Sequence, residues 1–352
     1  MKTVLYLTGL FLFPSIIIGC CNKKQINNTS VDKTPLSIIF DTDMGNDIDD
    51  ALALDMLYKY IENGQINLLA IPTSKKGKYC AEYLDIMNTW YGHNIPIGVV
   101  ENGTDKDNNA PFTKHTCELK QNGNLVFNRT INNYDDFYKS VSLYRKILSE
   151  QPDNSVIIIS VGFSTNLAQL LDSPADKYST LSGIELIRKK VKYVSTMMGN
   201  IKDQNHKEFN VFCDIPSAQK FINEWPTPIM ISPYEVGDAI LFPAQSIEND
   251  FKWKSPNPLV IGYINYMQMP YDRQTWDLTA VLYAVEKEKK FFGNSEWGTL
   301  NIDNTGATTF IVNPKGKHRY LTVNKEQALK IQKYFIQLIT QIPAKYKKTT
   351  LN

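Results

Sequence analysis

The sequence predicts an α/β fold in which a mostly parallel, open central sheet is flanked by helices. Two observations support this. Between residues 36 and 100, apolar runs of strand length alternate with segments of helical length in the order β-α-β-α-β, which favours parallel strands joined by right-handed crossovers. The run at 155–161 is apolar at almost every position, as expected of a central strand that is covered on both faces.

The first strand is expected at 36–40 and is followed by a helix at 51–58, a strand at 65–71, a helix at 78–91 and a strand at 95–100. Residues 101–133 are polar and rich in Asn, Lys and Gly, which predicts a long irregular insertion. The remaining predicted elements are a helix at 135–150, strands at 155–161, 191–197 and 228–232, an extended segment at 208–210, short strands at 298–302, 308–312 and 319–323, and an amphipathic C-terminal helix at 326–342.

Composition and charge are those of an ordinary globular protein, with 43% hydrophobic and 21% charged residues among 352. The 38 Lys and Arg residues nearly balance the 36 Asp and Glu residues, which leaves a net charge of +2 and no basic block. This balance argues against nucleic acid as a main partner.

The N-terminal segment has the pattern of an export signal, because Lys2 precedes an apolar run that ends near residue 19. A membrane-spanning anchor is the alternative, but the run is short for the ~20 apolar residues needed, and Pro14 interrupts it. Residues 17–20 (Ile-Ile-Gly-Cys) are similar to a bacterial lipobox, which implies cleavage before Cys20 and lipidation of its thiol. We therefore expect an exported lipoprotein that is anchored to a membrane and faces the periplasm or cell envelope. The expected divisions are a signal peptide at 1–19, a flexible tether at 20–34, one α/β domain at 35–343 and a tail at 344–352.

Five carboxylates follow the first strand within ten residues, namely Asp41, Asp43, Asp47, Asp49 and Asp50. They stand between a strand end and a helix start, which is where open α/β sheets bind ligands. Unpaired carboxylates there would repel one another, and a bound hard cation would compensate them; aspartate oxygens suit Ca²⁺ or Mg²⁺ better than zinc. Some of the acids would serve instead as helix caps. An EF-hand loop fits less well, because Leu54 stands at its twelfth position.

The stretch 40–51 resembles the N-terminal signature of the nucleoside hydrolases, the inosine/uridine-preferring family with its Asp-x-Asp-x-Gly-x-Asp-Asp-Ala motif. The chain carries two extra residues there. Three later segments resemble the family's other blocks in the same order: Gly-Phe-Ser-Thr-Asn at 162–166, Glu-Phe-Asn at 208–210 with Asp-Ile-Pro at 214–216, and Trp-Asp at 276–277. The resemblance covers roughly residues 36–340.

What the resemblance implies is a calcium-dependent hydrolase of N-ribosidic bonds in nucleosides or related ribosides, with oligomerisation left open. The Ca²⁺ ligands would be Asp43, Asp50, Asp277 and the backbone carbonyl of Val161. Asp43 would also act as general base toward a water that the metal holds. The ribose hydroxyls would be bound by Asp47 or Asp49, by Glu208 and Asn210, and by Asn200 or, alternatively, Asn205.

The largest departure from the family is Trp276, which stands where many members have a catalytic histidine. An indole cannot protonate a leaving group, but it can stack on a flat base. His115 and His206 lie in loops expected to border the pocket, so either is a candidate for a substitute acid. Two other readings stay open: a lipoprotein that binds a ribosyl ligand without cleaving it, and a hydrolase of a different glycoside.

Overall fold

The computed structural model describes residues 1, 3–5, 34–104, 106 and 111–350. The chain divides into two units, Met1–Lys33 and Thr34–Asn352, and the second contains all the helices and strands described below. Most of the predicted signal peptide, the lipobox and the tether lie outside the described residues. In the part of the chain that is described, no helix has the length and apolar character needed to cross a membrane.

Within the described residues, the second unit is built on one eleven-stranded sheet. The strand order is β14-β13-β15-β9-β8-β7-β1-β2-β3-β6, with β12 paired to β15. Pairing is parallel from β15 through β6 and antiparallel at β12, β13 and β14. The strands are β1 (Leu36–Asp41), β2 (Ile66–Thr73), β3 (Ile97–Val99), β6 (Tyr138–Lys139), β7 (Val156–Ser160), β8 (Val191–Met197), β9 (Ile229–Ser232), β12 (Gly293–Asn294), β13 (Gly298–Ile302), β14 (Thr308–Val312) and β15 (His318–Thr322). The predicted mostly parallel α/β fold is confirmed.

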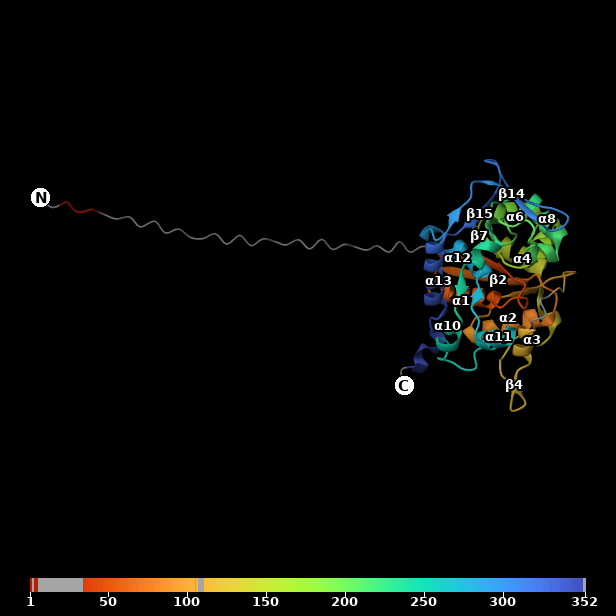
Figure 1. Cartoon of the computed structure of the whole chain (residues 1–352), viewed down its shortest axis with the longest axis horizontal. Helices are drawn as coiled ribbons and strands as arrows, with labels where there is room; N and C mark the ends of the chain where they lie inside the picture. Colours follow the sequence, from red (N-terminus) through yellow and green to blue (C-terminus); the bar gives the residue numbers. More distant parts are fainter. Residues whose placement is uncertain (2, 6–33, 105, 107–110, 351–352) are drawn as a thin grey trace. The chain divides into compact units, whose positions relative to one another are not determined.

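Helices cover both faces of this sheet (Figure 1). Ile38 and Phe40 of β1 join the apolar cluster on one face, whereas Ile39 joins the cluster on the other, because successive strand side chains point to opposite faces. The first face is covered by α1 (Asp49–Glu62), α2 (Lys78–Tyr91), α12 (Trp276–Glu286) and α13 (Lys325–Ile339); the second by α4 (Ser140–Glu150), α5 (Thr165–Asp172), α6 (Gly183–Lys190) and α8 (Ile215–Glu224). All five residues of β7 are buried, as predicted for a central strand.

Three predicted segments differ from the structure. The insertion at 101–133 is not wholly irregular, because it contains α3 (Phe112–Glu118) and the small hairpin of β4 (Lys120–Gln121) and β5 (Asn124–Leu125). The helix predicted at 135–150 begins only at Ser140, after a 3₁₀ turn and the short strand β6. Residues 208–210 are not extended: Glu208 caps α7 (Phe209–Cys213), because its carboxylate accepts the first backbone N–H groups of that helix.

The order of strands creates a crevice at the carboxyl ends of the central strands. The chain leaves β1 toward β2 on one side and returns with β7 on the other side of β1. The loops that follow β1 and β7 therefore diverge at the carboxyl ends of these strands, which is the usual ligand site of open α/β sheets.

The two ends of the folded unit lie on the opposite side, near the amino ends of the parallel strands. Thr34 precedes the amino end of β1. Lys345 donates to the carbonyl oxygens of Thr89 and Trp90 at the end of α2, 3.0 Å from each. Helix α2 runs back from the carboxyl end of β2 toward the amino end of β3. These contacts therefore also lie near the amino ends of the parallel strands.

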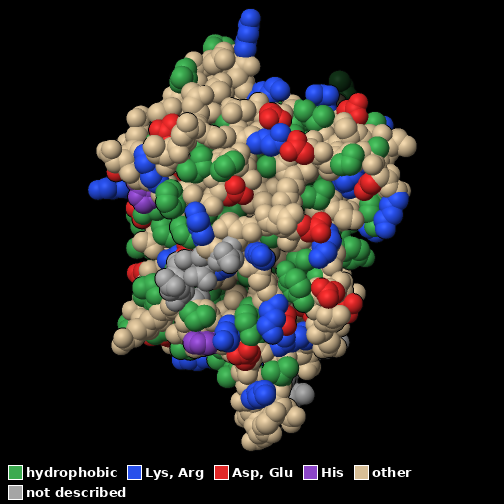
Figure 2. Space-filling view, turned by 90° about the vertical axis from the view of Figure 1, so that its right-hand side faces the viewer, with side chains coloured by type: hydrophobic (Ala, Val, Ile, Leu, Met, Phe, Trp, Pro, Cys, Tyr) green, Lys and Arg blue, Asp and Glu red, His purple; other side chains and the backbone are tan. Residues whose placement is uncertain are grey.

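Charged side chains are interspersed on the face seen in Figure 2, where acidic and basic groups alternate and hydrophobic side chains form only small groups. This face therefore carries no large field of a single sign.

Candidate active site

A cavity of about 290 Å³ opens at the carboxyl ends of the parallel strands. Segments that follow β1, β7, β8 and β9 line it together with the start of α12. The lining residues are Asp43, Asn46, Asp47, Asp50, Val161, Met197, His206, Lys207, Glu208, Phe209, Asn210, Tyr234, Trp276 and Asp277. A larger cavity of about 580 Å³ lies near the amino ends of β8 and β9, but it contains none of the predicted site residues.

Three buried aspartates from distant parts of the chain line the smaller cavity: Asp43, Asp50 and Asp277. Burial raises the pKa of Asp43 to about 7, with a further contribution from the charge of Asp47. Burial and the charge of Asp43 hold the pKa of Asp50 well above its usual range. Burial and the neighbouring acids do the same to the pKa of Asp277. This group therefore favours protonated carboxyls, and a bound cation would reverse that preference.

The donor atoms available to such a cation are all oxygens: the three carboxylates and the carbonyl of Val161. Oxygen donors suit Ca²⁺ or Mg²⁺. Among the described residues no three His, Cys, Asp or Glu side chains are arranged to hold a metal ion. Asp50 accepts the Thr42 hydroxyl, and the Val161 carbonyl accepts the Asn210 amide at 2.8 Å. The donor set thus fits a hard cation chemically, and its side chains would have to turn toward a common point to bind one.

Glu208 and Asn210 form the next part of the wall. The buried Glu208 carboxylate accepts the backbone N–H groups of Asn210 at 2.7 Å, Gly199 at 3.0 Å and Val211 at 3.2 Å. Asn210 also donates to the sulfur of Met197 at 3.3 Å. These bonds fix the turn at which the Glu-Phe-Asn segment meets the cavity.

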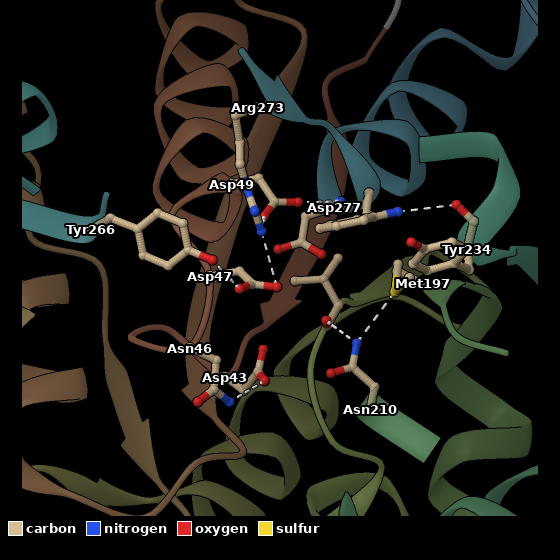
Figure 3. Close-up of polar contacts among 12 residues, drawn as sticks. Asp43, Asn46, Asp47, Asp49, Met197, Asn210, Tyr234, Tyr266, Arg273 and Asp277 are labelled. Atoms are coloured by element: carbon tan, nitrogen blue, oxygen red, sulfur yellow. Dashed lines mark hydrogen bonds and ion pairs between the residues drawn. The ribbon is translucent and has the colours of Figure 1, made fainter. Parts of the chain in front are cut away.

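The structure separates the two acids that the two-residue insertion left as alternatives (Figure 3). The Asp47 side chain is 33% exposed and lines the cavity, where it accepts the Tyr266 hydroxyl at 2.7 Å and pairs with Arg273 at 3.1 Å. Asp49 is 1% exposed and lies outside the lining. Its oxygens accept Arg273 Nη2 at 3.1 Å and the backbone N–H of Asp277 at 3.2 Å. Asp47 is thus placed to meet a ligand, and Asp49 holds the start of α12.

Neither Asn200 nor Asn205 belongs to the cavity lining. The Oδ1 atom of the buried Asn200 accepts the backbone N–H of Asp203 at 2.8 Å, so this side chain closes a turn. Asn205 is exposed, and its backbone N–H donates to Asp203.

An aromatic wall faces the acids. The Trp276 ring stacks on the Tyr234 ring at 5.3 Å, and its Nε1–H donates to the Tyr234 carbonyl oxygen at 3.0 Å. The His206 ring lies 4.2 Å from the Tyr234 ring. The Arg273 guanidinium lies 4.8 Å from the centre of the Trp276 ring. Arg273 and Tyr266 have no local signal in the sequence, because both reach the site only through tertiary contacts.

The cavity combines buried acids with an aromatic wall. The family model described as inosine-uridine preferring nucleoside hydrolase matches residues 38–334. The chain belongs to the nucleoside hydrolase family. Family membership makes it an N-glycosidase, an enzyme that hydrolyses N-ribosidic bonds.

Several solved structures share this fold. The inosine-uridine preferring nucleoside hydrolase from Bacillus anthracis aligns over 87% of this chain and 100% of its own, with a TM-score of 0.62 and 13% identity. The purine-preferring ribonucleoside hydrolase from Gardnerella vaginalis aligns over 86% and 98%, with a TM-score of 0.65 and 15% identity. The type III effector protein XopQ, solved with adenosine diphosphate ribose, aligns over 88% and 93%, with a TM-score of 0.57 and 12% identity. No curated protein matches the chain.

Proposed function

We propose that this nucleoside hydrolase family member is a Ca²⁺-dependent enzyme that cleaves nucleosides or related ribosides in the 290 Å³ cavity. The observation that carries the proposal is the division of the cavity into two sides. Buried carboxylates and amides suited to a cation and a sugar form one side, and flat aromatic rings suited to a base form the other.

Asp43, Asp50, Asp277 and the carbonyl of Val161 would hold the calcium ion. When bound, the ion supplies Lewis-acid activation of water. Asp43 accepts a proton from the attacking water, and Asn46 holds one oxygen of its carboxylate at 2.6 Å.

Asp47, Glu208 and Asn210 bind the ribose hydroxyls in this proposal. The carboxylates of Asp47 and Glu208 also face the positive charge that builds on the sugar ring as the glycosidic bond breaks, which lowers the barrier. Asn200 and Asn205 keep their places in the neighbouring loop, and we assign them no contact with the sugar.

Trp276 and Tyr234 provide a flat surface for the leaving group. A stacked aromatic pair contributes about 0.5–1.5 kcal/mol beyond the area that it buries. The indole N–H of Trp276 is engaged by the Tyr234 carbonyl, so Trp276 acts through its ring face and not as a proton donor.

Metal analysis and hydrolysis of p-nitrophenyl riboside test the proposal. The purified protein should carry one Ca²⁺, and a chelator should lower both the melting temperature and the hydrolysis rate, because a ligand of the folded state stabilises it. Asp277→Asn should weaken both effects. The exposed Asp250→Asn is the matched control and should leave them intact. Stoichiometric zinc, or a melting temperature that chelation and calcium do not move, would argue against the site.

A second candidate is a protein that binds a ribosyl ligand without cleaving it. The observation that favours it is the engaged indole N–H, which leaves the usual position of the leaving-group acid without one. The neighbour XopQ was solved with adenosine diphosphate ribose. Measurable affinity for ribose or adenosine diphosphate ribose, with no turnover of inosine or p-nitrophenyl riboside, would select this candidate.

We also propose that the mature chain starts at Cys20 and is anchored through lipid on its thiol. The support is the sequence at 17–20, which follows an apolar run. Cys20→Ser should move the protein from the membrane fraction to the soluble fraction or stall its processing. Identical processing and membrane fractionation of the variant would refute the anchor.

A further inference from the structure

The proposed cleavage leaves one requirement unmet, which is a proton for the departing base. When the bond between the anomeric carbon and the base breaks, its electron pair stays on the base, and a purine leaves more easily if it is protonated in the same step. Trp276 cannot supply this proton, since its only N–H donates to the Tyr234 carbonyl.

The cavity wall near Trp276 holds three side chains with an O–H or N–H group of the kind used in acid–base catalysis: Tyr234, Lys207 and His206. Burial and a hydrogen bond to Asp238 raise the pKa of Tyr234 above its already high value. The Lys207 ammonium is already engaged, because it donates to the Gln204 carbonyl at 3.0 Å. An imidazole is the side chain best matched to proton transfer at neutral pH.

His206 is also the only one of the four histidines, all of which are described, that lines this cavity. His115 is exposed and lies 3.1 Å from Asn265 Oδ1. His93 stacks on Tyr58, and His318 accepts the backbone N–H of Leu300 inside the sheet. The His206 ring continues the wall formed by Trp276 and Tyr234, so a base lying on that wall would be within its reach.

We propose that His206 is the general acid that protonates the leaving group, an inference that rests on the proposed function. The glycosidic carbon–nitrogen bond breaks and its electrons go to the base, while a ring N–H of His206 gives its proton to a base nitrogen. The water oxygen bonds to the anomeric carbon, and Asp43 takes the proton of that water. The products are the free base and ribose, and His206 recovers its proton from solvent.

The test compares two leaving groups in His206→Gln, His206→Ala and the matched control His115→Gln. Inosine needs protonation, whereas p-nitrophenolate leaves without it. Loss of a general acid should lower kcat/KM for inosine by about 10²–10⁴-fold, with little change for p-nitrophenyl riboside. His115→Gln should leave both rates unchanged. Added imidazole should restore part of the inosine rate of His206→Ala, which a purely structural defect would not allow.

Two results would overturn the assignment. An equal fall on both substrates would mean that His206 supports the fold or the sugar site, and an unchanged inosine rate would mean that another group is the acid. Retained p-nitrophenyl riboside turnover in His206→Gln shows that the variant is folded. A wild-type protein that cleaves neither substrate would refute the proposed function and the acid role together, whereas an active wild type with an unaffected variant refutes the acid role alone.

Discussion

Replacing Arg273 with methionine should destabilise the fold by several kcal/mol. The Arg273 side chain is 8% exposed, and its Nη2 atom lies 3.1 Å from both Asp47 and Asp49, of which Asp49 is almost fully buried. Removing one partner of a buried pair costs about 3–5 kcal/mol, because the other charge remains unpaired. Asp49 would keep its hydrogen bond from the backbone of Asp277, so we expect the lower end of that range.

Urea denaturation at pH 7 measures this change as a shift of the unfolding midpoint at constant slope. The control is Lys146→Met. Lys146 pairs with Glu150 at 3.0 Å across one helical turn, with side chains 32% and 52% exposed. Such an exposed pair contributes only about 0.3–0.5 kcal/mol.

The double variant Arg273→Met/Asp49→Asn separates an unpaired charge from lost packing. The neutral amide does not need a cation, so the double variant should be more stable than Arg273→Met alone, and its cost should be smaller than the sum of the two single costs. A cost below about 1 kcal/mol for Arg273→Met would refute the reasoning from burial. So would a double variant that is less stable than the single one.

Three further outcomes follow from the structure. Burial lowers the pKa of His318 to about 4, while the unfolded imidazole binds its proton near pH 6.5. The free energy of unfolding should therefore fall as the pH drops from about 6.5 to 4, and His318→Gln should reduce this pH dependence in urea titrations. In Gly162→Ala the new Cβ would lie 2.5 Å from the backbone nitrogen of Asp43 and from Ser74 Oγ, which should cost about 1–3 kcal/mol and lower the hydrolysis rate, as read by melting and turnover assays. Tyr266→Phe removes the 2.7 Å hydrogen bond to Asp47, so it should raise KM for the riboside several-fold while costing only about 1 kcal/mol of stability.

The strands of the sheet could be predicted because their apolar runs are continuous and flanked by polar turns. The structure has β8, β13 and β14 at the predicted bounds. The short helices α3 and α7 could not be predicted, because a helix of five to seven residues offers at most two turns of periodicity. α7 also depends on a cap in which a glutamate side chain folds back on the backbone.

The candidate site could likewise be predicted only in part. Asp43, Asp50 and Asp277 could be located from the motifs because each lies beside a strand end or opens a helix. The roles of Asp47 and Asp49 could not be separated, since the insertion changes which acid faces inward. The deciding residue is Arg273, which lies 224 positions from Asp49 in the chain. A pairing over that distance leaves no trace in local pattern or spacing.

Both ends of the folded unit lie near the amino ends of the parallel strands, and the cavity opens at their carboxyl ends. A reporter, an affinity tag or a solid support joined ahead of residue 34 or after residue 350 would therefore be coupled on the side of the domain away from the substrate mouth. Protein immobilised through either terminus should keep the turnover of the free protein. Small ribosides can therefore be screened on a surface without redesigning the domain.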